Sequence, residues 1–254
     1  MSISGKPVSG PEGGRAGNAM RILSGLLNLR SPREIEESFS LNELDFKLRP
    51  YLNYRRGFFV EAGANDGISQ SNTLYFEKYR QWKGILIEPI PDLAAKCRVN
   101  RPKCIVENFA LVPFDYKESH VEMRYCNLMS LVKGAMKSEE ADLVHIQEGC
   151  RVQNTDSFEL RVPARTLTSI LEANSVRKID LLSLDVEGFE LNVLKGVDFE
   201  KYQPALMLIE ARFRDEIDSF LKPFYEPIAE LSAHDVLYRL NQHARPTRRI
   251  RIDK

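Results

Sequence analysis

The chain has 254 residues, of which 43% are hydrophobic and 28% are charged, a size and composition typical of one globular α/β domain. Basic and acidic residues balance at 36 each, which excludes an overall field that would draw the whole molecule to nucleic acid or an anionic membrane. No run approaches the ~20 apolar residues of a membrane-spanning helix, and four cysteines without a CxxC spacing predict reduced thiols in a cytoplasmic protein rather than a zinc site.

The N-terminal segment, residues 1–30, is predicted to be disordered or loosely attached, because glycine, serine and proline dominate residues 1–19. Residues 20–29 predict a short surface helix, with peripheral membrane contact as the alternative. Ser31 and Pro32 indicate a capped helix start. Apolar residues at helical spacing continue over residues 41–52. Residues 31–240 are therefore expected to form a single domain with an N-terminal helical extension.

Short apolar runs of strand length follow, and helical patterns separate several of them. We expect strands at residues 58–60, 85–87, 104–106, 179–184 and 205–209, and helices at 72–79, 91–100, 167–173 and 189–194. Strands that are apolar along their whole length predict a parallel sheet with helices on both faces. Two further runs, 225–231 and 236–240, lie too close together for a crossover helix and predict an antiparallel hairpin. Five parallel strands with a C-terminal hairpin form the Rossmann-like sheet of class I methyltransferases.

Two polar segments have no clear periodicity. Residues 127–157 are expected to be irregular, either as a lid or substrate loop or as an ordinary connection. The tail, residues 241–254, is basic, and its segment 245–254 has five basic residues against one acidic residue. Such a patch could attract a phosphorylated or acidic acceptor, a nucleic acid or an anionic lipid. Because no aromatic residues interleave with these charges, we favour a solvated tail over a nucleic-acid contact.

The first predicted strand runs into the turn GFFVEAGANDG, residues 57–67. Gly63 and Gly67 can adopt positive φ, and Asn65 between them tolerates a left-handed conformation. Asn65 stands where the dinucleotide motif GxGxxG has its second glycine, so a pyrophosphate would fit this turn poorly. S-adenosylmethionine (SAM) has no phosphate, and it needs acceptors for its amino group and ribose hydroxyls. Glu61 and Glu88, each at the end of an apolar run, can supply them.

The stretch GFFVEAGANDGISQSNTLYFEKYRQWKGILIEPIPDL, residues 57–93, resembles the FkbM-type SAM-dependent methyltransferases. The later stretch KIDLLSLDVEGFELNVLKG, residues 178–196, is similar to the second signature of this family. The resemblance covers roughly residues 41–240. It implies SAM as the cofactor and O-methylation of sugars or secondary metabolites as the reaction, and it says much less about the acceptor.

The second signature also has a physical reading. The strand at 179–184 delivers Asp185 to the carboxyl end of the sheet, where open α/β sheets bind ligands. Glu187 can point to the same side, Gly188 turns the chain into the next helix, and Glu190 is expected to cap that helix. We expect Asp185 and Glu187 to position or deprotonate an acceptor hydroxyl. The alternatives are a divalent cation held by the two acids, which we favour less, and a merely solvated strand end.

Three further residues are expected at the same edge of the sheet. Asn108 could hydrogen-bond the adenine edge or belong to a simple turn, Ala110 would leave space for the ring, and Glu210 would face the acceptor or pair with Arg212. The four histidines are scattered, and His234 in the hairpin turn is expected to lie at the surface. We therefore assign cofactor binding to Glu61, Gly63, Ala64, Asn65, Gly67, Asn72, Glu88, Pro89, Asn108, Ala110 and Asp185.

The sequence hypothesis is a SAM-dependent O-methyltransferase that acts on a hydroxyl of a sugar, glycan or secondary metabolite. Asp185, Glu187 and Glu210 would form its catalytic group. An NAD-type oxidoreductase and a non-catalytic domain that binds SAM or a glycan are the alternatives. The expected partner is a small-molecule or glycan acceptor, and oligomeric state has no signal in the sequence.

Overall fold

The computed structural model of the protein describes residues 35–241. The predicted disorder of residues 1–30, the helix at 20–29, the helix start at Ser31 and the basic tail from residue 242 onward lie outside the described residues.

A seven-stranded sheet forms the centre of the fold, with the strand order β10-β11-β9-β8-β1-β2-β3. Its parallel strands are β1 (Phe58–Ala62), β2 (Lys83–Ile87), β3 (Ile105–Glu107), β8 (Leu181–Leu184) and β9 (Leu206–Glu210). β10 (Tyr225–Glu230) and β11 (Asp235–Leu240) form an antiparallel hairpin, and β11 pairs antiparallel with β9. The predicted arrangement of five parallel strands and a terminal hairpin is confirmed.

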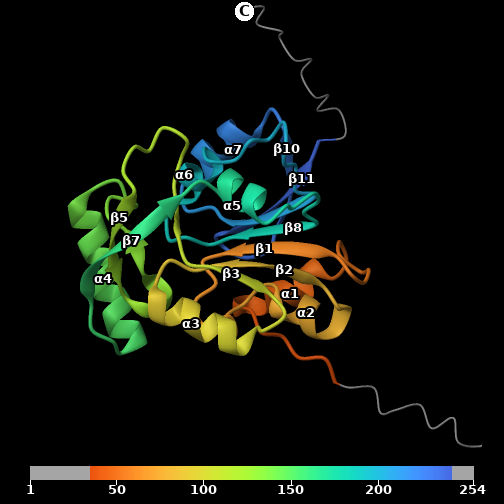
Figure 1. The fold of residues 1–254 in the computed structure, drawn as a ribbon, viewed down its shortest axis with the longest axis horizontal. Coiled ribbons are helices and arrows are strands. Elements are labelled where there is room, and N and C mark those ends of the chain that lie inside the picture. Colours follow the sequence, from red (N-terminus) through yellow and green to blue (C-terminus); the bar gives the residue numbers. More distant parts are fainter. Residues whose placement is uncertain (1–34, 242–254) are drawn as a thin grey trace, which may run out of the picture. The chain divides into compact units, whose positions relative to one another are not determined.

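Helices cover both faces of this sheet (Figure 1). α1 (Leu44–Leu48), α2 (Leu74–Arg80) and α3 (Pro91–Asn100) lie on one face, and α5 (Leu167–Ala173), α6 (Glu190–Leu194) and α7 (Arg214–Leu221) lie on the other. Successive residues of a strand point to opposite faces. Phe59 accordingly packs in the cluster with α1 and α2, while Val60 and Ala62 pack in the cluster with α5, α6 and α7.

A second sheet and a long helix lie between β3 and β8 in the chain. The four-stranded sheet has the order β4-β7-β5-β6, with β4 (Ala110–Leu111), β5 (His120–Tyr125), β6 (Leu131–Val132) and β7 (Phe158–Arg165). The short helix η2 (Asn127–Met129) follows β5, and α4 (Glu139–Gln153) connects β6 with β7. We call residues 110–165 the insert. The prediction that residues 127–157 are irregular is wrong.

The distribution of apolar residues along α4 explains why this helix was not predicted. Its buried positions are Asp142, Ile146 and Gly149, only one of which carries a large apolar side chain. Val144 and Val152 are exposed instead, so the apolar residues do not mark the buried face. The overlooked signal was the helix start, where Ser138 accepts a hydrogen bond from the Ala141 N–H at 3.1 Å and acidic residues fill the first turn.

The predicted helix over residues 41–52 is shorter in the structure. It consists of a 3₁₀ turn, η1 (Leu41–Glu43), followed by α1. Pro50 accounts for its early end, because a proline has no backbone N–H with which to continue the hydrogen bonds of the helix. All four cysteines are free thiols. Within residues 35–241, no helix has the length and apolarity required to cross a membrane.

Candidate active site

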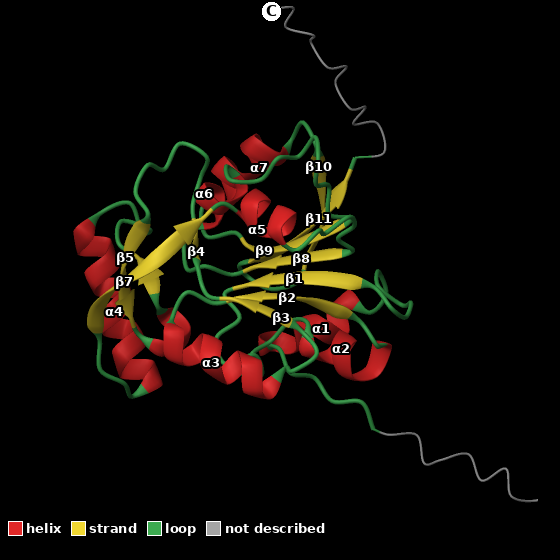
Figure 2. Cartoon of the chain, viewed as in Figure 1, coloured by secondary structure: helices red, strands yellow, loops and turns green. Residues whose placement is uncertain are grey.

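A cavity of about 410 Å³ lies between the large sheet and the insert, within the size range of small-molecule sites. The carboxyl ends of β1, β2 and β9 and the residues after β8 line one side of it. Residues of β5, η2, β6 and α4 line the other side. Figure 2 shows the insert beyond the ends of these parallel strands. The cavity is therefore at the edge where the sequence analysis expected a ligand.

The glycine turn after β1 is shaped by the neighbouring strand β8. Gly63 has φ +84°, and a Cβ atom at this position would lie 1.8 Å from the Asp185 carbonyl oxygen. Asn65 adopts a left-handed φ of 48°. Its side-chain amide donates to Asn127 Oδ1 of the insert at 3.2 Å. Gly63 and Asn65 both line the cavity, so the turn supplies part of the wall and a link to the insert.

Glu88, directly after β2, presents a buried carboxylate at the cavity. Its Oε2 accepts a hydrogen bond from the Asn65 N–H at 2.8 Å, and its Oε1 accepts one from the Ile90 N–H at 2.9 Å. Burial raises the pKa of Glu88 to about 8, although the two N–H groups favour the ionised form. Each oxygen keeps a further lone pair, so this oriented carboxylate can also accept ligand hydroxyls.

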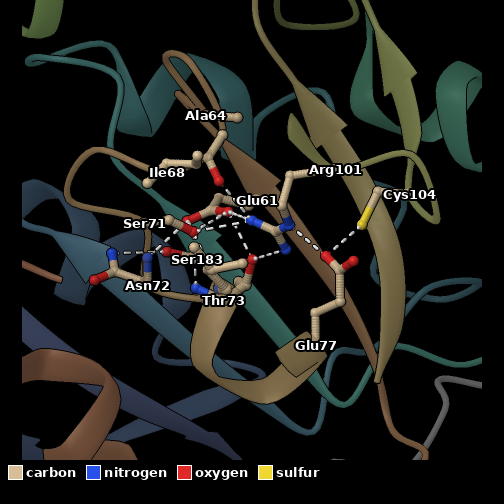
Figure 3. Close-up of polar contacts among 12 residues, drawn as sticks. Glu61, Ala64, Ile68, Ser71, Asn72, Thr73, Glu77, Arg101, Cys104 and Ser183 are labelled. Carbon is tan, nitrogen blue, oxygen red and sulfur yellow. Dashed lines mark hydrogen bonds and ion pairs between the residues drawn. The ribbon is translucent and has the colours of Figure 1, made fainter. Parts of the chain in front are cut away.

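Glu61 was predicted to bind the cofactor, but in the structure it does not belong to the cavity lining. Its carboxylate accepts hydrogen bonds from the Asn72 N–H at 2.8 Å and the Thr73 hydroxyl at 2.6 Å. Arg101, which is fully buried, lies 3.8 Å from it and also pairs with Glu77. Figure 3 shows this network, in which the groups around Glu61 point toward its carboxylate. The observed contacts of Glu61 hold β1, α2 and α3 together.

The other predicted cofactor residues divide into two groups. Pro89, Ala110 and Asp185 line the cavity with Gly63, Asn65 and Glu88. Ala64, Gly67, Asn72 and Asn108 do not line it. The Asn108 amide donates to the carbonyls of Glu88 and Pro89, each at 2.8 Å, and the Asn72 amide donates to Ser183 at 3.1 Å. Both amides thus support the walls rather than facing the cavity.

The three predicted catalytic acids are brought together. Asp185, Glu187 and Glu210 line the cavity, and each offers a carboxylate oxygen within 4.8 Å of the others. Asp185 is exposed to the cavity, and desolvation there together with repulsion by Glu210 raises the pKa of its carboxyl. Burial and Glu210 also raise the pKa of Glu187, to about 8. The group can take up a proton near neutral pH, and its spacing would also admit one divalent cation.

Arg212 neutralises part of this acidic group. Its guanidinium donates to Glu187 Oε2 at 2.7 Å and to Glu210 Oε2 at 3.1 Å, so the expected Glu210–Arg212 pair does form. No hydrogen bond or ion pair to the Asp185 carboxylate occurs within residues 35–241. Asp185 is therefore the acid that is available to a ligand.

The turn after Asp185 holds the group in place. Glu187 has a left-handed φ of 52°, followed by Gly188 at 91°, a conformation that is rare for a glutamate and typical of functional sites. Glu190 lies in the first turn of α6, as predicted, and its Oε1 accepts the Val186 and Gly188 N–H groups at 3.2 and 2.9 Å.

His145 of α4 is a site residue that the sequence analysis missed. Its Nε2 lies 3.3 Å from Glu187 Oε2 and has no hydrogen-bond partner among the described residues. Burial and the positive charge of Arg212 lower the pKa of His145. His145 and Glu187 are 42 positions apart in the chain, so no local sequence pattern could have predicted their contact.

The comparisons with known proteins identify the family of the chain. The family model described as "Methyltransferase FkbM domain" matches residues 61–240. No curated protein matches the chain.

Two similar solved structures show low identity to the chain. One is a TehB-like SAM-dependent methyltransferase from Corynebacterium glutamicum, with 10% identity, a TM-score of 0.42, and coverage of 78% of this chain and 88% of that chain. The other is the fibrillarin pre-rRNA processing protein of Methanococcus jannaschii, with 11% identity, a TM-score of 0.36, and coverage of 73% and 66%. The family model covers well over half of the chain. The protein belongs to the FkbM family of SAM-dependent methyltransferases.

Proposed function

We propose that the protein transfers the methyl group of SAM to a hydroxyl of a sugar, glycan or secondary metabolite. The supporting observation is that a single cavity is lined by two sets of residues. Gly63, Asn65 and Glu88 form the part that we assign to the cofactor, which we call the cofactor wall, and Asp185, Glu187 and Glu210 form the acidic group. Membership of the methyltransferase family argues against the alternative of an NAD-type oxidoreductase, because the cofactor of this family is SAM and not NAD.

The residues of the cofactor wall fit SAM. Glu88 can accept hydrogen bonds from two ribose hydroxyls because both of its oxygens are oriented by backbone N–H groups and keep a free lone pair. Pro89, Phe109 and Leu111 offer apolar surface for the adenine ring. When bound, SAM supplies an electrophilic methyl group on a sulfonium.

The acidic group suits a hydroxyl acceptor. A neutral hydroxyl is a weak nucleophile, so a carboxylate that accepts its proton as the new oxygen–carbon bond forms lowers the barrier. Asp185 lines the cavity without a competing partner among residues 35–241, and we assign it this role. Arg212 orients Glu187 and Glu210 through two hydrogen bonds. A hydrogen bond to Asp185 would hold the acceptor oxygen in the cavity, and an in-line displacement further requires this oxygen, the methyl carbon and the sulfur to be aligned.

Replacing Asp185 by asparagine tests the proposal. Asp185→Asn should lower methyl transfer about 10²- to 10⁴-fold, the usual contribution of a general base, while the affinity for S-adenosylhomocysteine stays near that of the wild type. Transfer would be measured as incorporation of tritiated methyl into the small molecules of a cell extract, and affinity by calorimetry. Glu226→Gln is the matched control, because Glu226 is an acid of β10 whose partner among the described residues is Arg239 at the surface. Unchanged transfer in Asp185→Asn would remove Asp185 from the mechanism.

A further inference from the structure

The charges of the cavity wall restrict the acceptor. Four acids, Glu88, Asp185, Glu187 and Glu210, line the cavity, and Arg212 is the only basic residue among the described lining residues. An anionic group such as a phosphate or a carboxylate is normally bound by arginine, by lysine or by the N–H groups of a helix N-terminus. Next to those acids that are ionised, such a group would meet like charges.

Arg212 is not available to an anionic ligand. It already binds Glu187 at 2.7 Å and Glu210 at 3.1 Å, and its side chain is only partly exposed. Turning the guanidinium toward a phosphate would leave two enclosed carboxylates without their counter-charge, which is strongly unfavourable. Arg212, the one basic side chain of the described wall, therefore neutralises carboxylates of the protein and not a charge of the ligand.

The rest of the wall is apolar and partly open. Leu41 and Val152 line the cavity although their exposed fractions are 53% and 58%. Leu128, Met129 and Phe189 add further apolar surface, and methionine side chains adapt to irregular ligand shapes. A ligand that covers Leu41 and Val152 would remove apolar surface from water, so an apolar ligand portion is favoured here.

We infer that the acceptor is an uncharged molecule whose reacting hydroxyl lies next to an apolar portion, such as an aglycone or an alkyl chain. An acceptor with a phosphate or carboxylate beside its reacting hydroxyl is disfavoured by the acids that line the described part of the cavity. This inference rests on the proposed transfer to a hydroxyl and narrows it.

The charge of the labelled product tests the inference. The full chain would be incubated with tritiated-methyl SAM and a small-molecule cell extract, and the products passed over an anion exchanger at neutral pH. We expect the label in the unretained fraction, and we expect it to partition into 1-butanol. Label that is retained and then released by phosphatase treatment would overturn the inference but leave the hydroxyl methylation intact. An absence of labelled product, with S-adenosylhomocysteine still bound, would overturn the proposed function itself.

A pair of variants on one helix tests the apolar wall. Val152→Glu should reduce labelling at limiting extract at least tenfold, without changing the affinity for S-adenosylhomocysteine. Val144→Glu is the control, because Val144 lies on the same helix at 66% exposure but does not line the cavity. Equal labelling by the two variants would contradict an apolar acceptor portion at Val152. A loss of S-adenosylhomocysteine affinity in Val152→Glu alone would contradict the assignment of this wall to the acceptor.

Discussion

At the scale of single residues, Glu88 links the cofactor site to pH. Its pKa is raised to about 8 by burial, and ribose hydroxyls donate more favourably to the ionised carboxylate. The affinity for S-adenosylhomocysteine should therefore increase as the pH rises toward 8 and level off above it. Below the pKa the change should approach tenfold per pH unit, in line with about 1.4 kcal/mol per unit. Calorimetry between pH 6 and 9 would measure this.

Glu88→Gln provides the comparison for that experiment. The amide cannot ionise, so its affinity should be lower and nearly constant with pH. A wild-type affinity that is flat over the same range would show that Glu88 is already ionised or does not contact the ligand.

Arg101 is expected to affect the stability of the fold rather than cofactor binding. Its guanidinium is buried between Glu61 and Glu77, so Arg101→Met should lower the free energy of unfolding by about 3–5 kcal/mol, the usual range for breaking a buried ion pair. Urea denaturation would measure the change. Arg98→Met on the same helix is the control, since Arg98 makes an exposed hydrogen bond to the Val106 carbonyl. A loss of under 1 kcal/mol in Arg101→Met would contradict a structural role for the network.

At the scale of elements, the approach of β1 to β8 depends on Gly63. Gly63→Ala combines a positive φ with a contact of 1.8 Å to the Asp185 carbonyl. We expect it to lower stability by more than the ~1–2 kcal/mol that a left-handed conformation alone requires of a side chain, and to displace Asp185. Gly134→Ala isolates the conformational effect, because Gly134 has φ +88° but no atom within 4 Å of the added Cβ. Equal losses of stability in the two variants, measured by urea denaturation, would contradict the close approach.

At the scale of the whole molecule, the cavity joins the large sheet to the insert. Asn65 of the glycine turn is hydrogen-bonded to Asn127 of η2 at 3.2 Å, and both residues line the cavity. S-adenosylhomocysteine should therefore slow amide hydrogen exchange over residues 127–130 as well as over residues 63–67. The helix α7 provides an internal reference and should remain unchanged. Protection confined to residues 63–67 and 87–90 would mean that the cofactor contacts the sheet alone.

The sequence by itself determined the parallel sheet, its hairpin, the family and the strand ends that line the cavity. These features depend on local information: apolar runs of strand length, a hairpin connection too short for a helix, and two contiguous signatures around Gly63 and Asp185. Carboxyl ends of parallel strands meet at one edge whatever the details of packing. Glu88, Asp185, Glu187 and Glu210 were for that reason predicted at one place and found lining one cavity.

Only the tertiary structure decided which polar groups face the cavity and which face the protein. Glu61 and Glu88 have the same position after an apolar run, but Arg101, distant in sequence, lies 3.8 Å from the carboxylate of Glu61. The insert likewise escaped prediction because α4 buries a single large apolar side chain. His145 joined the acidic group through a contact between distant segments, and Arg212, for which only a pair with Glu210 was considered, also binds Glu187. Such contacts depend on how whole elements pack, and no short pattern in the chain encodes them.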